Sequence, residues 1–309
     1  MNIVIATDRN FALQAAVFLH SLRVTHTETE AEILLLHPGL PDSTLSTLRE
    51  VCGPWPLHPR KVDESHLRSA RLPRRLPPST LFRLSVAELA PEDWVHALYL
   101  DVDLVVRRDL TGLWELRSTI DVAAAVRDEG TPFFGSPKGP PWRALGVPPQ
   151  TPYFNSGVLL IDLTRWAAED VAARSLEILR VHDLPHADQC AINTVLLGRI
   201  TPLEPQWNVM SHLYMDHNHL AIAKGAMSLE HVREEAAVVH YCTSSLRRPW
   251  EEGCEHPERD LWWSHHDALR ATIDDTAWSS IAPAQSNQMT PRKAIFRGLR
   301  SWPVARGQS

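Results

Sequence analysis

Two carboxylates stand two residues apart at Asp101 and Asp103, directly after the apolar run 95–100. This run predicts a buried strand, and residues 104–106 keep the backbone extended beyond it. Because residues i and i+2 of an extended chain point to the same side, both carboxylates leave the strand end together, while Val102 points to the other face. The two carboxylates repel each other unless a positive charge lies between them. A hard divalent cation supplies that charge, and it typically binds substrate phosphates at the same time. The alternative is a strand that ends in solvated aspartates.

The first half of the chain alternates strand and helix patterns, which is typical of a parallel sheet with helices on both faces. Strands are expected at 2–7, 33–37 and 95–100, and helices at 11–23, 41–51 and 79–89. We therefore predict an α/β fold with a doubly wound, mixed but mostly parallel sheet. Ligands of such sheets bind beyond the carboxyl ends of the strands, where Asp8 and the aspartate pair both fall.

The second half continues with strands and two long loops. Strands are expected at 121–126, 154–161 and 236–241, with helices at 164–182 and 187–197. The loops at 53–78, which contains a short strand, and 130–152 are too long for plain connectors and indicate function. No linker separates two domains, so we predict one domain over 1–275 and a tail over 276–309.

Composition excludes several classes of protein. The 309 residues carry a net charge of −6, which gives no overall attraction to nucleic acid. The four cysteines show no paired spacing and are interpreted as reduced thiols of a cytosolic protein. No run approaches a membrane span and no signal peptide is visible. The sequence therefore predicts a cytoplasmic location.

The C-terminal tail differs from this average, because no acidic residue follows Asp275 while several basic ones do. A helix over 292–302 would gather Ile295, Leu299 and Trp302 on one face and Lys293, Arg297 and Arg300 on the other. That pattern is typical of an anchor on a membrane surface, here the inner face of the cell membrane. The alternatives are a disordered tail or a helix that packs on its own domain.

Six segments in a fixed order carry a resemblance to a known family. They are residues 5–10 (IATDRN), 81–84 (LFRL), 98–103 (LYLDVD), 153–160 (YFNSGVLL), 188–189 (DQ), and 239–242 (VHYC) followed by 248–250 (RPW). This order and spacing, over about the first 270 residues, resemble glycosyltransferase family 8, the group of glycogenin and bacterial lipopolysaccharide α-galactosyltransferases.

The resemblance implies a GT-A fold that binds a nucleotide-sugar, usually a UDP-sugar, through manganese or magnesium (Mn²⁺ or Mg²⁺). It also implies transfer with retention of anomeric configuration. Asp101 and Asp103 would hold the metal together with His240, which matches a third protein ligand and offers a neutral imidazole nitrogen. The alternative for His240 is a buried strand histidine that bonds only to backbone.

The same resemblance assigns residues to the nucleotide. Ala6, Asp8 and Asn10 match positions that hold the uracil and ribose; Asp8 and Asn10 are equally good N-caps for the helix that follows. Arg83 matches an arginine that reaches the diphosphate and the donor sugar, where the alternative is an exposed helix arginine. Val102 lies between the two metal ligands and belongs to the same set.

Further positions match the sugar-binding part of the family site. By this resemblance Asn155 and Ser156 would lie near the donor sugar, where Gly157 would allow close backbone approach. Asp188 would bind sugar hydroxyls, with a helix N-cap as the alternative, and Gln189 would lie below the anomeric carbon. Asp128, by the same resemblance, would face the donor sugar or the acceptor. Asp188, Gln189 and Asp128 are the catalytic candidates.

The sequence departs from the family pattern in two places. The usual His-x-x-Gly followed by Lys-Pro-Trp is altered, because Thr243 replaces the glycine and the loop is two residues longer. Arg248 stands where the phosphate-binding lysine would stand, with Arg247 as its rival. A histidine that often precedes the arginine helix is missing from 73–78, so neither galactose nor glucose is assumed.

We therefore predict a retaining, metal-dependent glycosyltransferase with a nucleotide-sugar donor and a glycan, lipid-linked or small-molecule acceptor. Attack from the leaving-group face is favoured over a double displacement through Gln189 or Asp188, because an amide is a poor nucleophile. One rival is a sugar nucleotidyltransferase, which needs a glycine-rich loop that residues 7–11 lack. The other is a non-catalytic nucleotide-sugar binding protein.

Other clusters are interpreted as structural. His212, Asp216, His217 and His219 match no usual zinc spacing and are expected in a polar loop. Trp262, Trp263 and Trp278 are expected to pack in the core rather than to form a sugar platform. His265 and His266 are expected on a solvated helix face.

Overall fold

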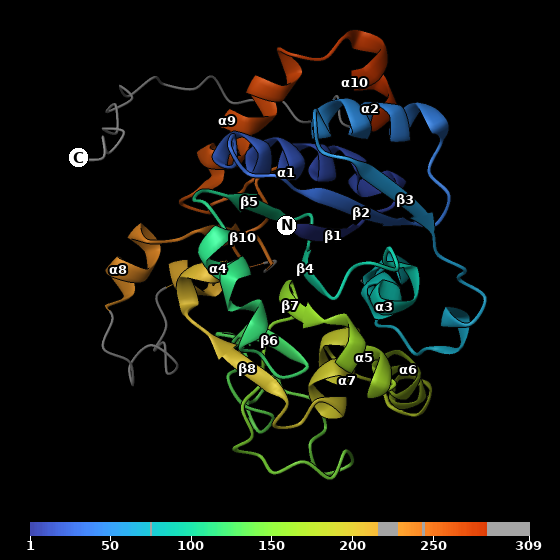
Figure 1. Cartoon of the computed structure of the whole chain (residues 1–309). Coiled ribbons are helices and arrows are strands. Elements are labelled where there is room, and N and C mark those ends of the chain that lie inside the picture. The colour runs from blue at the N-terminus through green and yellow to red at the C-terminus, as the bar shows by residue number, and fades with distance from the viewer. Residues whose placement is uncertain (75, 216–227, 243–244, 283–309) are drawn as a thin grey trace.

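A computed structural model describes residues 1–74, 76–215, 228–242 and 245–282. Its centre is a seven-stranded sheet in the order β3-β2-β1-β4-β7-β6-β8 (Figure 1). The strands are β1 (Asn2–Ala6), β2 (Glu32–His37), β3 (Leu57–Lys61), β4 (His96–Leu100), β6 (Ala123–Val126), β7 (Val158–Asp162) and β8 (Ile200–Leu203). Only β7 runs antiparallel to its neighbours, β4 and β6. The prediction of a mixed, mostly parallel sheet is confirmed.

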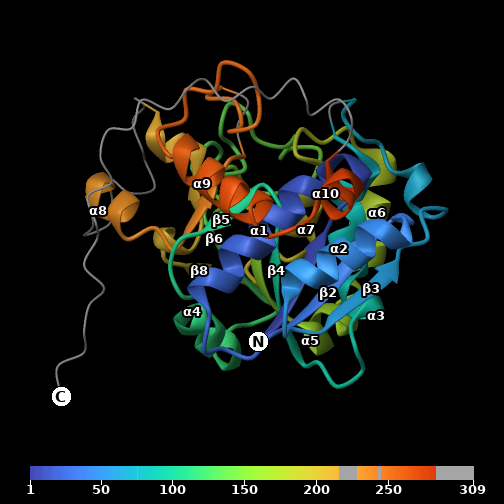
Figure 2. The same cartoon turned by 90° about the horizontal axis from the view of Figure 1, so that it is seen from above.

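Helices cover both faces of this sheet. Side chains alternate between the two faces along each strand, so each strand contributes to two separate cores. In β1, Ile3 and Ile5 face a core with α1 (Ala12–Thr25), α2 (Asp42–Cys52), α9 (Arg259–Arg270) and α10 (Asp275–Ile281). Val4 faces the opposite core, which contains α3 (Val86–Leu89), α5 (Leu163–Ala168), α6 (Val171–Val181) and α7 (Ala187–Val195). Figure 1 shows these two helical layers above and below the strands, and Figure 2 looks down on the layer that contains α1, α2, α9 and α10.

A small second sheet lies beside the first, in the order β5 (Leu104–Val106), β10 (Val238–His240), β9 (Val209–Met210). In this sheet His240 is in register with Leu104 and Met210. The pairing therefore sets His240 next to Asp103, the residue that precedes β5. The remaining α-helices of the described residues, α4 (Thr111–Glu115) and α8 (Leu229–Glu234), are short, and several 3-10 helices complete the fold.

Several predicted boundaries were wrong. The expected helix 164–182 is divided into α5 and α6, because Asp170 adopts a left-handed conformation with φ 49°. The expected helix 79–89 is mostly a 3-10 helix over Pro78–Ser85 that continues into α3. The strand expected at 154–161 begins only at Val158 in β7, and the residues before it form an irregular turn in the site described below.

The tryptophans of the C-terminal helices pack internally, as predicted. Trp262 is fully buried and packs against Trp250 and Trp263. The expectation of a solvated histidine pair was wrong, because the His266 ring stacks on Trp262 at 5.3 Å between centroids and His265 Nδ1 lies 3.2 Å from His20 Nδ1 of α1.

The end of the described chain is structured beyond residue 275. That predicted domain limit coincides with the first residue of α10, which packs on α2 through a hydrogen bond from Thr44 Oγ1 to Ser280 O at 2.8 Å. The tail helix predicted at 292–302 lies outside the described residues. Within them, no helix is long and apolar enough to cross a membrane. All four cysteines are free, as predicted.

His256 is a buried histidine that joins the second sheet to the C-terminal helices. Its side chain is 3% exposed, and its ring packs against Tyr214 and Tyr241. Its Nδ1 accepts a hydrogen bond from the Glu258 backbone N–H at 3.1 Å. Burial lowers the pKa of His256 from 6.5 to about 4.

We expect this histidine to make the fold less stable in mild acid. Between pH 6.5 and about 4 the unfolded chain holds a proton on His256 that the folded chain lacks, so the free energy of unfolding falls as pH falls through this window, by up to roughly 3 kcal/mol. Above pH 6.5 this contribution is fully present. His256→Asn keeps an acceptor for Glu258 and does not titrate. Urea unfolding at pH 7 and 4.5 should show a smaller loss for the variant; equal losses in both proteins would contradict the expectation.

Candidate active site

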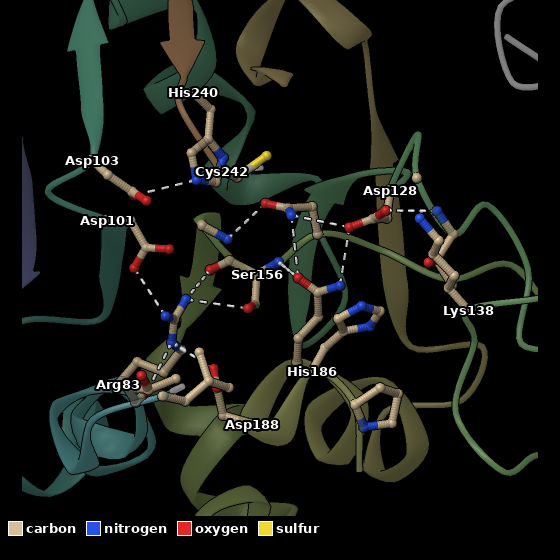
Figure 3. A pocket seen from close by; sticks show the side chains of 18 of the residues that line it. Arg83, Asp101, Asp103, Asp128, Lys138, Ser156, His186, Asp188, His240 and Cys242 are labelled. Atoms are coloured by element: carbon tan, nitrogen blue, oxygen red, sulfur yellow. Dashed lines mark hydrogen bonds and ion pairs between the residues drawn. The ribbon is translucent and has the colours of Figure 1, made fainter. Parts of the chain in front are cut away.

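A cavity of about 1010 Å³ opens where β1, β4 and β6 end. Figure 3 shows that side chains from distant parts of the chain converge on it. Most of the residues predicted from the sequence line this one cavity, namely Ala6, Arg83, Asp101, Val102, Asp103, Asp128, Asn155, Ser156, Asp188, Gln189, His240 and Arg248. The sheet topology therefore brings together what the sequence holds far apart.

Two predicted residues lie outside this lining. Asp8 caps the short 3-10 helix Arg9–Phe11 by accepting the Asn10 N–H at 2.8 Å, whereas no side chain caps α1 itself, so the N-cap alternative holds for Asp8 at this 3-10 helix and not for Asn10. The other Asp8 oxygen accepts from Ser79 Oγ at 2.8 Å, and Ser79 lines the cavity. Asn10 is exposed and does not line it. A nucleotide role for both residues stays a prediction.

Asp101, Asp103 and His240 converge at one end of the cavity (Figure 3). One ligand atom of each lies within 4.8 Å of the others. Asp103 Oδ1 is 3.3 Å from His240 Nε2. Burial tends to raise the pKa of Asp103, but the opposing effects of His240 and Arg248 are stronger together and lower it. Two carboxylates and one imidazole form a donor set that suits Mn²⁺, so these residues fit the predicted metal.

Gly157 keeps this group of ligands compact. A Cβ atom at this position would lie 2.4 Å from His240 Cε1 and 2.9 Å from Asp101 Oδ2, distances at which atoms overlap. The Gly157 carbonyl also accepts the Asp101 N–H at 2.8 Å, so the backbone cannot easily retreat. The close approach at Gly157 is therefore to the predicted metal ligands, and its predicted role beside the donor sugar stays a prediction.

We expect Gly157→Ala to weaken metal binding by about 10- to 100-fold, because the added methyl displaces His240 or Asp101 from the shared centre. Calorimetric titration with Mn²⁺ measures the effect. Gly112→Ala is the matched control, since a Cβ there would meet only Trp207 at 3.4 Å. Equal Mn²⁺ affinity in the Gly157 variant and the control would show that the site tolerates the methyl group.

Arg83 is the buried cation of the cavity, and only 5% of it is exposed. Its Nη2 donates to Asp101 Oδ1 at 2.9 Å, and its Nε pairs with Asp188 Oδ2 at 2.7 Å. Its guanidinium also lies 4.6 Å from the centre of the Tyr99 ring. Arg83 thus joins the metal end of the cavity to α7, and its interpretation as an exposed helix arginine is excluded.

Asp188 and Gln189 stand at the start of α7. Ala187, the first residue of this helix, has φ 39°, an unusual conformation for a residue with a Cβ. The side chain of Asp188 does not cap the helix, so that alternative was wrong. Burial raises the pKa of Asp188 to about 6, against the opposing effect of Arg83.

Asp128, Asn155 and Gln189 form a hydrogen-bonded cluster on the cavity wall. Asp128 Oδ2 accepts from Gln189 Nε2 at 3.0 Å and from Asn155 Nδ2 at 3.1 Å. Gln189 Oε1 accepts the Ser156 backbone N–H at 3.1 Å. Because a backbone N–H can only donate, this bond fixes which end of the Gln189 amide faces the strand entry. The irregular turn before β7 thus presents polar groups at the cavity wall instead of continuing the backbone hydrogen-bond ladder of the sheet.

Arg248, rather than Arg247, approaches the predicted metal end. Arg248 Nε lies 3.6 Å from Asp103 Oδ2, and its backbone N–H donates to Glu251 Oε2 at 2.8 Å. Arg247 instead donates to the Glu252 carbonyl and does not line the cavity. Residues 243–244 of this altered loop lie outside the described residues.

Sequence reasoning missed several cavity residues. His212 lines the cavity from the 3-10 helix Ser211–Tyr214, and burial lowers its pKa; the expectation of a polar loop was wrong for it. Asp216, His217 and His219 lie outside the described residues. Tyr99, Lys138 and His186 also line the cavity. No spacing signalled these residues, because they reach the site from separate loops and strands.

The fold and the site define a GT-A glycosyltransferase. A solved structure of the galactosyltransferase LgtC, in complex with donor and acceptor sugar analogues, superimposes with a TM-score of 0.71 at 23% identity, covering 91% of this chain and 100% of that one. The chain belongs to glycosyl transferase family 8, whose model matches residues 2–254.

Curated relatives agree with this assignment. General stress protein A of Bacillus subtilis (strain 168) is 24% identical over 296 residues, which cover 93% of this chain and 98% of that protein. The lipopolysaccharide 1,3-galactosyltransferase of Salmonella typhimurium is 24% identical over 221 residues, which cover 66% of this chain and 61% of that protein. Family membership implies a nucleotide-sugar donor and a glycan acceptor.

Proposed function

We propose that this protein transfers a sugar from a UDP-sugar to an acceptor hydroxyl, with retention of configuration and with a bound divalent ion. The observation that supports this most is the convergence of Asp101, Asp103 and His240 on one side of a cavity whose other side holds Asp188 and Gln189. Arg83 spans the two sides. Such an arrangement holds a diphosphate and a sugar at the same time.

The diphosphate half of the reaction falls to the charged residues. A metal ion held by Asp101, Asp103 and His240 would neutralise the negative charge that develops on the leaving diphosphate. Arg248 stands beside Asp103 and offers a second, planar cation to the same phosphates. The ion pair with Asp103 keeps this guanidinium beside the predicted metal ligands.

The sugar half falls to the buried polar cluster. Asp188 and Asp128 offer carboxylate oxygens to sugar hydroxyls, while Gln189 presents an amide whose two ends are both hydrogen-bonded. This bonding leaves Gln189 ordered but not nucleophilic. We favour attack from the leaving-group face: the acceptor oxygen bonds to the anomeric carbon, the bond to the phosphate oxygen breaks with its electron pair, and the acceptor proton passes to that phosphate.

The acceptor is proposed by class alone. One relative carries the name lipopolysaccharide 1,3-galactosyltransferase, which supports a glycan or lipid-linked acceptor. Pro137, Lys138 and Pro141, from the long loop, also line the cavity, and we place the acceptor on their side of it. The predicted membrane contact through the tail receives no support from the described residues or from the relatives.

A screen of UDP-sugars for hydrolysis, with Mn²⁺ or with a chelator, tests the proposal. We expect one or a few donors to be hydrolysed with Mn²⁺ only, and proton NMR should show the released sugar first in the anomeric form of the donor. Binding of UDP without turnover of any donor would instead identify a non-catalytic binding protein. Formation of UTP from pyrophosphate and a UDP-sugar would identify a nucleotidyltransferase.

A further inference from the structure

Asn208 lies behind the site and touches both of its halves. It stands between the 3-10 helix Pro205–Trp207 and β9, and it has no exposed surface. Its Oδ1 lies 2.9 Å from His240 Nδ1, and its Nδ2 lies 2.9 Å from Asn155 Oδ1. No motif in the sequence marks this residue.

The direction of these hydrogen bonds follows from a single backbone group. The Gly157 N–H can only donate, and its acceptor at 2.9 Å is Asn155 Oδ1. The other end of the Asn155 amide is therefore the NH₂ group, which agrees with its bonds to Asp128 and Gln189. Since Asn155 presents an oxygen to Asn208, Asn208 must present its own NH₂ group in return.

The same reasoning fixes the histidine. With its NH₂ group on Asn155, Asn208 has only its oxygen left for His240, so His240 Nδ1 must carry a hydrogen. In the neutral ring the other nitrogen, Nε2, is then a bare acceptor. This is the atom that faces Asp103 Oδ1 at 3.3 Å. A lone pair opposite a carboxylate is the arrangement that a cation between them stabilises.

We propose that Asn208 is a positioning residue that holds His240 in its metal-binding tautomer and ties this tautomer to the orientation of Asn155 in the sugar half. The inference rests on the proposed function, since it assumes that His240 binds a metal and that Asn155 lies near the donor sugar. Its physical basis is general, because a histidine ligand is oriented by the partner of its other ring nitrogen. Here that partner is itself oriented by the strand entry at Gly157.

We expect replacements of Asn208 to uncouple the predicted metal end of the site from its sugar half. Asn208→Ala removes both hydrogen bonds and should lower Mn²⁺ affinity by about 10- to 100-fold. Asn208→Asp keeps an acceptor for His240 but turns an oxygen toward Asn155 Oδ1. We expect the aspartate variant to retain Mn²⁺ binding, while it loses the gain in affinity that wild type shows for a UDP-sugar over UDP.

The first measurement uses the wild-type protein alone. Nitrogen-15 chemical shifts of the His240 ring in metal-free protein at pH 8, assigned by comparison with His240→Gln, should show a protonated Nδ1. The opposite tautomer would overturn the inference, and this result depends neither on catalysis nor on the folding of any Asn208 variant. If wild type shows the expected tautomer but binds no Mn²⁺, the proposed function fails instead.

Calorimetry of the variants completes the test. Asn193→Ala is the matched control, because Asn193 is also buried and hydrogen-bonds to the Phe154 and Gln189 backbone, away from His240. We expect Asn193→Ala to keep wild-type Mn²⁺ affinity and the wild-type His240 tautomer, while Asn208→Ala loses both. Equal Mn²⁺ affinity in wild type and Asn208→Ala, or loss of Mn²⁺ binding in the aspartate variant, would overturn the inference.

Discussion

Replacing Asp103 with asparagine is expected to lower kcat/KM for the donor by at least about 1000-fold, a loss of roughly 4 kcal/mol in transition-state stabilisation. Asp103 contacts both His240 and Arg248, so it connects the predicted metal to the cation beside it. An asparagine of the same shape keeps one oxygen but cannot balance two positive charges. The measurement is Mn²⁺-dependent hydrolysis of the donor that the screen identifies.

The control for this substitution is Asp260→Asn. Asp260 lies in the first turn of α9, and 86% of its side chain is exposed. Any effect of losing one negative charge on the whole protein should therefore appear in the control as well. An Asp103→Asn protein with full, Mn²⁺-dependent activity would contradict the assignment of the metal site.

Replacing Arg83 with methionine is expected to cost about 3–5 kcal/mol of folding stability, because it leaves buried carboxylates without their cation. Asp188 is 2% exposed and pairs with Arg83 Nε at 2.7 Å, and its pKa is already raised to about 6. Methionine fills a similar volume but offers no charge. Urea unfolding at pH 7.5 measures the loss, and donor turnover should disappear with it.

A double-mutant cycle separates the ion pair from the packing. In Arg83→Met combined with Asp188→Asn, the carboxylate is neutral, so the double variant should be more stable than the sum of the two single losses indicates. We expect Asp188→Asn alone to cost less than Arg83→Met, since Arg83 keeps its bond to Asp101. Strictly additive losses would mean that the Arg83–Asp188 pair is not the source of the stability.

The parts of the site that follow from strand geometry were predictable from the sequence. Asp101 and Asp103 share one centre and Val102 is buried in the core, as predicted, although residues 102–103 form a bend between β4 and β5 instead of continuing one extended strand. The alternation of strand and helix patterns along the chain also predicted the sheet. The strands could be recognised because fully buried strands such as β1 and β4 are continuous apolar runs. These features depend only on local periodicity and burial.

The rest depends on long-range pairing that a single sequence does not show. Asn208 reaches His240 only because β9 pairs with β10, and β9 is two residues long. The break between α5 and α6 lies at a left-handed Asp170 in an otherwise helical pattern. Arg83 is an ordinary helix arginine in the sequence, and it becomes the buried link of the site only when β4 and α7 lie beside it.

The most direct test of the whole account is calorimetric binding of UDP with saturating Mn²⁺ and, separately, with a chelator. If Asp101, Asp103 and His240 hold an ion that bridges to the diphosphate, Mn²⁺ should tighten UDP binding by at least roughly 100-fold, or about 2.7 kcal/mol. The Asp103→Asn protein should lose most of this gain. Equal UDP affinity with Mn²⁺ and with the chelator in the wild-type protein would contradict the account.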